Sequence, residues 1–375
     1  MQWRVCRVVR EVRRWPGAVE YAALLAPVND SDEADREIRA LAYTAMVGEP
    51  GVGERVLVNA SALLKGLGTG GLAFIVARPD VPVPDPEPSS GHIVKARYTP
   101  MQQMLLAVDE QDSPHHPALR EATHLYGLPV VVADLHSALP AVLAGLRADH
   151  PQARVAYVMT DGGALPSAFS RSVAGLREAG WLAATITVGQ AFGGDHEAVS
   201  LHTGLLAARA VVDADVAIVI QGPGNVGTGT RWGFSGVACA EALHAAHVLD
   251  GRPIATLRVS GADPRGRHRG ISHHSRTAYG RALLAPAVVP VPVLDPAVVG
   301  AELPELISQQ AEELALDAVA ELSLIPVECD GLLEALAATP VPLSTMGRGL
   351  SEDPAAFLAA AVAGRWAGRS LSERP

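Results

Sequence analysis

One loop of the sequence, SGADPRGRHRGISHH, gathers guanidinium and imidazole groups directly behind an apolar run. Arg265 and Arg267 could turn planar guanidinium forks toward one phosphate or carboxylate, and His268 could help to neutralise it. His273 and His274 are candidates for proton transfer, because imidazole titrates near neutral pH. The alternative is a solvated basic loop without a ligand. We favour a functional loop, because it follows a predicted strand.

A second loop, QGPGNVGTGT, is rich in glycine and also follows an apolar run. Backbone N–H groups at Gly222, Gly224 and Gly227, with the hydroxyls of Thr228 and Thr230, could cradle an anion. The glycines match the dinucleotide pattern GxGxxG. However, the next helix is expected several residues later, and no acidic residue ends the following strand. A mononucleotide or other phosphate ligand is therefore favoured over a dinucleotide, and tight turns alone remain the alternative.

Two further loops carry carboxylates after apolar runs. Asp161 could act as a general base or hold a metal, with Gly162 and Gly163 beside it for anion binding; otherwise it forms a turn. Asp195 is a similar candidate, although it could equally cap the next helix. Metal ligation by the neighbouring His196–Glu197 pair is disfavoured, because adjacent residues rarely reach one ion together. The sequence therefore predicts no metal site.

These loops need a scaffold that brings them together. Continuous apolar runs alternate with helical patterns in the second part of the chain, which is typical of a mainly parallel, doubly wound α/β sheet. In such a sheet, ligands bind beyond the carboxyl ends of the strands. We therefore expect five loops to form one pocket. The runs expected as strands are 104–108, 129–133, 155–159, 183–188, 216–220 and 254–259.

The N-terminal part has a different organisation. Short apolar or alternating runs over residues 1–78 predict a small β-rich, barrel-like domain. Prolines crowd residues 79–90 and indicate a stiff linker. Residues 91–375 would then form the α/β domain that carries the ligand site. Two domains also suit a chain of 375 residues.

Composition narrows the classes of partner. The net charge of −10 argues against nucleic acid and anionic membranes as partners of the whole surface. The three cysteines are widely spaced, and neither a signal peptide nor a transmembrane segment is indicated, so we expect a cytoplasmic protein. An oligomer is compatible with the sequence. Lysine occurs only at Lys65 and Lys95, and Lys95 is the better candidate for a required point charge.

The chain resembles an uncharacterised bacterial protein family, domain of unknown function 3866. This resemblance names a relative without supplying a reaction. It supports treating His92, Lys95 and Arg97 as part of a functional segment. The similar strings are VGERVLVN, GLGTGG, GHIVKARYTP, TDGGALP, AFGGDHEAV, QGPGNVGTGT and RHRGISHH.

Together these features predict an enzyme that acts on a phosphorylated or nucleotide-like small molecule. Asp161 and either His273 or His274 would transfer protons. The alternative is a protein that senses an anion or serves as a scaffold without turnover. A constellation of Asp161, Asp195 and a histidine would favour the enzyme, whereas arginines and backbone amides alone would favour the sensor. The sequence identifies neither substrate nor cofactor.

Overall fold

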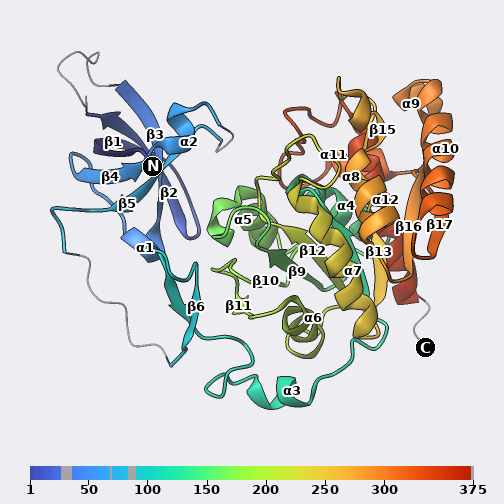
Figure 1. The fold of residues 1–375 in the computed structure, drawn as a ribbon, viewed down its shortest axis with the longest axis horizontal. Coiled ribbons are helices and arrows are strands. Elements are labelled where there is room, and N and C mark those ends of the chain that lie inside the picture. The colour runs from blue at the N-terminus through green and yellow to red at the C-terminus, as the bar shows by residue number, and fades with distance from the viewer. Residues whose placement is uncertain (27–35, 68–69, 83–89, 373–375) are drawn as a thin grey trace. The chain divides into compact units, whose positions relative to one another are not determined.

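The chain forms two compact units, Met1–Leu105 and Leu106–Pro375, each with its own hydrophobic core (Figure 1). The predicted linker, residues 79–90, lies largely outside the described residues. The first unit includes the segment from Gly91 to Leu105, which the sequence analysis had placed in the second domain. The domain limits at 78 and 91 remain a prediction. This computed structural model describes residues 1–26, 36–67, 70–82 and 90–372.

A closed five-stranded barrel dominates the first unit, which confirms the predicted barrel-like architecture. Inward-facing residues such as Val56 and Val58 alternate with more exposed ones, as a barrel wall requires. Two short helices follow β3 and β4. The elements are β1 (Trp3–Trp15), β2 (Ala18–Leu25), β3 (Arg36–Tyr43), α1 (Thr44–Val47), β4 (Arg55–Asn59), α2 (Ser61–Leu64) and β5 (Leu72–Ala77).

A separate antiparallel hairpin ends the first unit, formed by β6 (Ile93–Lys95) and β7 (Gln103–Leu105). The strand expected over residues 104–108 is therefore wrong in its bounds. Beyond β7, Ala107 makes only an isolated bridge with Glu197 in the second unit. Lys95 is the last residue of β6 and is buried.

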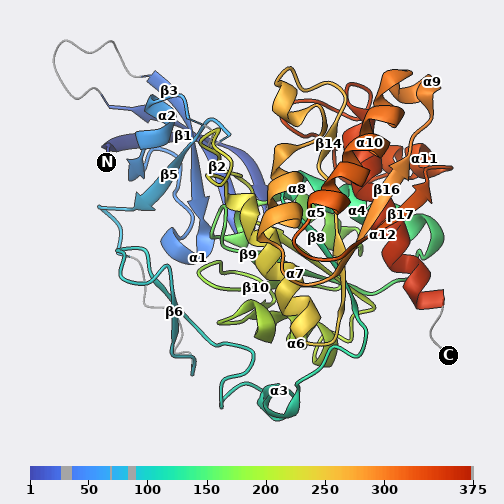
Figure 2. The same ribbon diagram turned by 45° about the vertical axis from the view of Figure 1, so that its right-hand side comes forward.

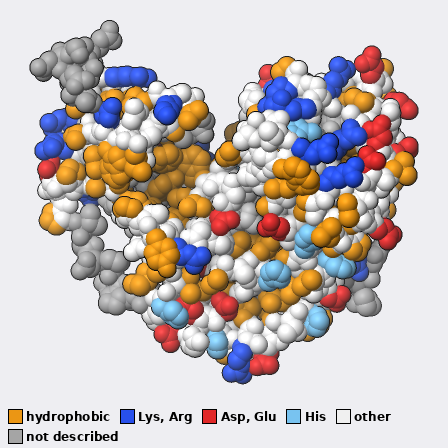
Figure 3. Space-filling model, viewed as in Figure 1, with side chains coloured by type: hydrophobic (Ala, Val, Ile, Leu, Met, Phe, Trp, Pro, Cys, Tyr) orange, Lys and Arg blue, Asp and Glu red, His pale blue; other side chains and the backbone are white. Residues whose placement is uncertain are grey.

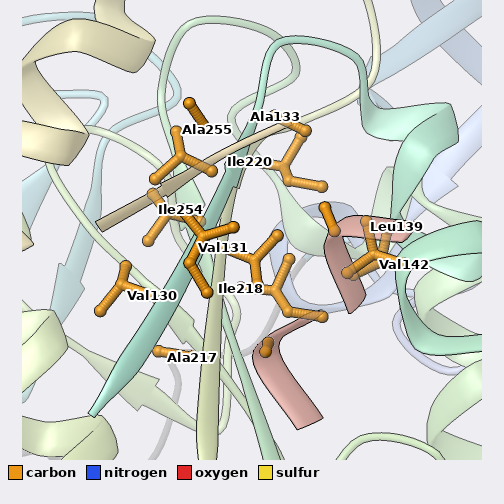
Figure 4. Packing of buried hydrophobic residues seen from close by; sticks show 14 of the residues in the cluster. Val130, Val131, Ala133, Leu139, Val142, Ala217, Ile218, Ile220, Ile254 and Ala255 are labelled. Atoms are coloured by element: carbon orange, nitrogen blue, oxygen red, sulfur yellow. The ribbon is translucent and has the colours of Figure 1, made fainter. Parts of the chain in front are cut away.

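The second unit is built on an eight-stranded sheet whose strands are all parallel. Every residue of β8 and of β12 is buried, so both faces of the sheet centre are covered. Figure 4 shows Val131 and Ile218 of these strands packed beside Leu139 and Val142 of α4. In spatial order the strands are β11 (His196–Glu197), β10 (Ala184–Thr187), β9 (Val155–Thr160), β12 (Val216–Gln221), β8 (Pro129–Ala133), β13 (Arg252–Ala255), β16 (Ala287–Val293) and β17 (Leu322–Glu328).

Helices cover this sheet, which confirms the predicted α/β class. Figures 1 and 2 show α6 and α7 side by side, and they pack on β9 and on β8 and β13 respectively. A second group, α4, α11 and α12, packs together, and α12 contacts β8 and β16. No helix among the described residues is both long and apolar enough to cross a membrane. The helices are α3 (His116–Glu121), α4 (Leu139–Asp149), α5 (Arg171–Glu178), α6 (Leu201–Ala210), α7 (Cys239–Val248), α8 (His273–Thr277), α9 (Pro296–Val299), α10 (Glu302–Asp317), α11 (Leu332–Ala337) and α12 (Pro354–Ser372).

The strand β16 was not predicted, because Pro290 and Pro292 interrupt its sequence. Both prolines lack the N–H that a central strand donates. Since alternate N–H groups point toward the same neighbour, both missing donors lie on one side of the strand. Pairing with β13 is confined to Val288, before the prolines, while β17 pairs along the whole length of β16. The prolines of β16 thus lie beyond Val288, where its pairing with β13 has already ended.

Candidate functional site

Three polar side chains meet at the carboxyl ends of β8 and β13. Asp134 directly follows β8, Arg258 lies three residues beyond β13, and His274 is in α8. Arg258 Nη1 lies 2.8 Å from Nδ1 of His274 and 3.4 Å from Oδ2 of Asp134, and His274 Nδ1 lies 3.1 Å from the same Oδ2. With a proton on Nδ1, His274 donates to Asp134; without it, Nδ1 accepts from Arg258. The trio can therefore support either tautomer of the imidazole.

The carboxyl group of Asp134 is buried yet remains charged. Burial by itself raises its pKa, but the hydrogen bond from His274 and the charge of Arg258 outweigh burial and lower the pKa below its ordinary value. The side chains of Arg258 and Asp134 are only 11% and 10% exposed, so the pair is shielded from water. A buried ion pair of this kind fixes geometry more reliably than it adds stability.

A short hairpin folds the arginine–histidine loop back onto this trio. The strands β14 (Val259–Ser260) and β15 (Gly270–Ile271) pair antiparallel, and Gly270 permits the return with a φ of 67°. Ser272 then caps α8, because its hydroxyl accepts from the N–H of His274. The same hydroxyl lies 2.7 Å from Nδ1 of His268. One serine thus positions two of the histidines.

The result is a cluster of His268, His273 and His274. One ring nitrogen from each lies within 4.8 Å of those of the other two. The rings of His273 and His274 are 4.5 Å apart between centroids, and Phe234 stacks on His274 at 3.9 Å with nearly parallel planes. Burial, and then the positive charge of neighbouring residues, lowers the pKa of His268 to about 3 and that of His273 to about 4. Both imidazoles are neutral at physiological pH.

This cluster lines a cleft that is partly open to solvent and holds about 540 Å³ of empty space, the open part included. Its wall also includes Asn225 and the backbone at Gly227 and Gly229 from the glycine-rich loop. Three arginines complete it: Arg258, Arg265 and Arg267. Figure 3 shows that basic side chains of the second unit gather over α8, while acidic ones lie farther out over α10. The local charge is therefore opposite in sign to that of the whole chain.

Arg265 and Arg267, the two arginines predicted to bind an anion, differ in whether a carboxylate already pairs with them. Arg265 forms a bidentate pair with the buried Asp263, through contacts of 2.9 Å and 2.8 Å, and this pairing holds the pKa of Asp263 well below its usual range. Its guanidinium fork is therefore largely occupied within the loop. Arg267 is exposed, and no carboxylate among the described residues lies within ion-pair distance of it. Of the two, Arg267 is better placed to meet a ligand from solution.

The glycine-rich loop does not open a helix. Residues 227 and 234 form a bridge, and Thr228 N donates to Gly233 O, so the loop closes as its own small hairpin. The hydroxyls of Thr228 and Thr230 lie 3.0 Å apart on its exposed surface. The following helix, α7, begins only at residue 239. The dinucleotide geometry, in which a helix starts at the third glycine, is absent here.

Glycines 162, 163 and 222 serve close packing between two loops. A Cβ at Gly162 would collide with Gln221 Oε1, and one at Gly163 with the carbonyl of Gly222. A Cβ at Gly222 would in turn meet the carbonyl of Ala164. Among the described residues, neither Gly162 nor Gly163 lines the histidine cleft. Their presence is explained by the contact of the loops after β9 and β12.

The predicted carboxylates lie elsewhere. Asp161 is exposed, and its Oδ2 accepts from Gln190 N at 2.9 Å, which fixes a turn after β10. Asp195 lies beside the amino end of β10, where it accepts from Thr185 N at 2.7 Å and pairs with Arg177 at 2.6 Å. It does not cap α6, since Ser200 does so. Only three of the five predicted loops, those after β8, β12 and β13, line the cleft, so the single-pocket expectation is only partly met.

Sequence reasoning missed Arg258 and gave Asp134 no role. Asp134 directly follows the predicted strand 129–133, which is the signal that could have found it. Arg258 was missed because it lay inside the predicted strand 254–259, whereas β13 ends at Ala255. The reasoning also missed Met346, which reaches the cleft from the loop before α12. Lys95 belongs to the first unit, whereas all lining residues described above belong to the second.

A separate pair, His136 and Ser170, resembles a nucleophile and its base. Nε2 of His136 lies 2.7 Å from the Ser170 hydroxyl. However, Ser170 is only 3% exposed, and its oxygen caps α5 by accepting from Val173 N. The other imidazole nitrogen faces the carbonyl of Gln221 at 3.3 Å. This pair therefore ties the loop after β8 to α5 and β12.

Acid should destabilise the protein through His136. Burial lowers its pKa to about 4, against a weaker opposing effect from the carbonyl of Gln221. The unfolded chain takes up this proton near pH 6.5, so stability falls as pH drops from about 6.5 to about 4, by up to roughly 3 kcal/mol. Urea unfolding at about pH 7 and about pH 5 should show a smaller acid-induced loss in His136→Gln than in wild type. The exposed control His247→Gln should behave as wild type, and an equal loss in all three proteins would exclude His136 as the cause.

Fold and site together define an α/β protein with a cleft of histidines and arginines at the carboxyl edge of a parallel sheet. Comparison with known families agrees with the resemblance noted in the sequence. Residues 39–364 match a family described as protein of unknown function (DUF3866), and the chain belongs to that family. No curated protein and no solved structure matches the chain significantly.

Proposed function

We propose that the protein is an enzyme acting on a phosphorylated or other anionic small molecule bound in the histidine cleft. One observation carries the proposal: Arg258 and Arg267 line the same cleft as His273 and His274, at the carboxyl edge where parallel sheets bind ligands. Guanidinium groups suit phosphate and carboxylate oxygens. A neutral imidazole beside them can accept a proton from the bound molecule.

Within this proposal, Asp134 takes the role that the sequence analysis gave to Asp161. Its carboxylate lies 3.1 Å from Nδ1 of His274 and can orient that ring. His273 lies farther toward solvent than His274 and is neutral at physiological pH, so it can act as a base. Asp195 has no part in the reaction, because its carboxylate pairs with Arg177 away from the cleft.

The closed hairpin of the glycine-rich loop does not support a dinucleotide cofactor. Backbone groups at Gly227 and Gly229, rather than Gly222 or Gly224, would contribute to anion binding, since these line the cleft. A cytoplasmic location remains part of the proposal, supported by three cysteines that are all free. The proposal includes neither nucleic acid nor a membrane as partner and leaves the oligomeric state open.

Replacing Arg267 by alanine should weaken anion binding by roughly tenfold or more, because one charge-assisted hydrogen bond contributes about 1.5–3 kcal/mol. Arg267→Lys should recover only part of the affinity, since lysine keeps the charge and loses the fork. Calorimetric titration of inorganic phosphate and of mononucleotides into each variant measures this. Arg269→Ala is the matched control, because Arg269 is equally exposed two residues away and pairs with Glu302.

Equal affinity of the wild type and Arg267→Ala for the ligand that binds would remove Arg267 from the site. Turnover is tested separately, by mass spectrometry of a cell extract incubated with the protein. An enzyme depletes a compound and accumulates its product, and His273→Ala should abolish that change. A protein that retains an anion without depleting it is instead the sensor that the sequence left as an alternative.

A further inference from the structure

We propose that His268, His273 and His274 bind one divalent transition metal ion of the zinc class. One nitrogen from each ring already lies within 4.8 Å of the other two. Tetrahedral zinc with Zn–N bonds of 2.0–2.1 Å holds its nitrogens about 3.4 Å apart. The rings need to close by little more than an ångström, which small side-chain rotations can supply. The sequence analysis assigned no metal ligand and considered these residues for anion binding and proton transfer. With an ion bound, His273 and His274 would serve as ligands in place of the proton-transfer role given to them in the proposed function.

Two of the rings have hydrogen-bond partners at Nδ1, and Arg258 Nη1 is one of them, at 2.8 Å from Nδ1 of His274. Nδ1 of His268 faces Ser272 Oγ at 2.7 Å, and Nδ1 of His274 faces Asp134 Oδ2 at 3.1 Å. Each ring can therefore present Nε2 to an ion. A carboxylate behind a histidine is the usual partner of a metal ligand, because it fixes the tautomer and makes the ring more basic. Phe234, stacked on His274, fixes the plane of that ring.

The cluster must suit a cation in its surrounding charge as well as in its ligand atoms. Imidazole must be neutral to bind an ion, and metal affinity falls where protons compete. Arg258, Arg265 and Arg267 line the same cleft as the three histidines. These arginines repel a free cation. The ionised Asp134 offsets part of that repulsion, and an anion on the metal would offset the rest.

Ligand chemistry restricts which ions fit. Imidazole nitrogen selects zinc, cobalt, nickel, copper or iron over magnesium and calcium, which prefer oxygen. Three protein ligands also leave one tetrahedral position open, as in catalytic rather than structural zinc sites. That position would face the cleft lined by Arg258 and Arg267, where an anionic ligand could bind metal and guanidinium together. We therefore expect metal and anion to bind cooperatively.

The test uses the full-length protein stripped with a chelator. Titration with Zn²⁺ by calorimetry should give one ion per chain, and Co²⁺ should give the visible absorption of a tetrahedral site. His268→Ala and His273→Ala should each lower the affinity by a hundredfold or more. Asp134→Asn should lower it by about 10–100-fold, as expected for a residue that orients a ligand. The control is His247→Ala, an exposed histidine on α7, which should bind metal as wild type does.

Several results would overturn the proposal. One is wild-type affinity for Zn²⁺ in the double variant His268→Ala/His273→Ala. Another is the absence of a tetrahedral Co²⁺ spectrum in the wild type. Circular dichroism shows whether the variants fold; if they do not, X-ray absorption of the zinc-loaded wild type decides, and fewer than three imidazole ligands refute the site. Because these measurements use no substrate, their failure leaves the anion proposal intact. If the wild type binds Zn²⁺ as expected but binds no anion, only the proposed function is refuted.

Discussion

Replacing Gly364 by leucine should leave the second unit unfolded or only marginally stable. Gly364 is in α12, and a Cβ added there would collide with the backbone carbonyl of Val142 in α4. The contact is reciprocal, because a Cβ at Gly145 of α4 would collide with the carbonyl of Ala361 in α12. The two helices therefore cross with their backbones in contact. Since backbone cannot rotate away as a side chain can, we expect a loss of about 4 kcal/mol or more.

Thermal and urea unfolding of the purified variant measure this loss. Gly266→Leu is the matched control, because a Cβ at Gly266 meets no atom within 4 Å. Its stability should differ from wild type by no more than about 0.5 kcal/mol, as for most surface substitutions. Gly364→Ala should fall between the two leucine variants. If Gly364→Leu unfolds as Gly266→Leu does, α4 and α12 do not pack as closely as the structure describes.

Replacing Arg258 by methionine should cost about 3–5 kcal/mol at neutral pH, because it leaves the buried carboxylate of Asp134 without its cation. The wild-type fold lowers the pKa of Asp134, so the stability from its charge is present above the ordinary value of 3.8 and is lost as pH falls through the lowered pKa. In Arg258→Met the unpaired carboxylate can escape its penalty by taking up a proton. The difference in free energy of unfolding between wild type and Arg258→Met should therefore become smaller in acid.

A double variant separates the effect on stability of breaking the ion pair from the effect of losing side-chain packing. Asp134→Leu/Arg258→Met removes both charges and should recover part of the stability, since no uncompensated charge remains. The control is Arg209→Met, whose partner Asp213 is 85% exposed, and it should cost less than about 1 kcal/mol. A loss in Arg258→Met as small as in this control would mean that His274 alone is enough to hold the Asp134 carboxylate.

These two predictions concern the framework that positions the cleft. The helix α12 packs against both α4 and β8, and the loop after β8 carries Asp134. Through Asp134 the loop contacts Arg258 and His274, and hence the whole histidine cluster. A stable crossing of α4 and α12 is therefore a condition for the geometry on which both the proposed reaction and the proposed metal site depend.

The sequence by itself determined the class of the fold and predicted where along the chain the polar loops lie. Apolar runs alternating with helical patterns predicted a parallel sheet, because a strand buried on both faces must be apolar throughout. The placement of polar loops after those runs singled out the loop from residue 260 to residue 274, and residues of this loop line the cleft. These conclusions depend on local periodicity, which is readable without knowing what lies across from each residue.

Only the tertiary structure decided which groups meet. Asp134 pairs with a histidine 140 positions away and an arginine 124 positions away, and strand order, not sequence spacing, sets such encounters. The order places β8 next to β13, so their loops share the cleft, while β9 and β10 lie farther along the sheet. Likewise, the sequence does not distinguish a glycine that faces an anion from one that faces a neighbouring backbone. Gly163 and Gly222 proved to be packing residues because the atoms opposite them belong to another loop, and that is a property of three-dimensional proximity alone.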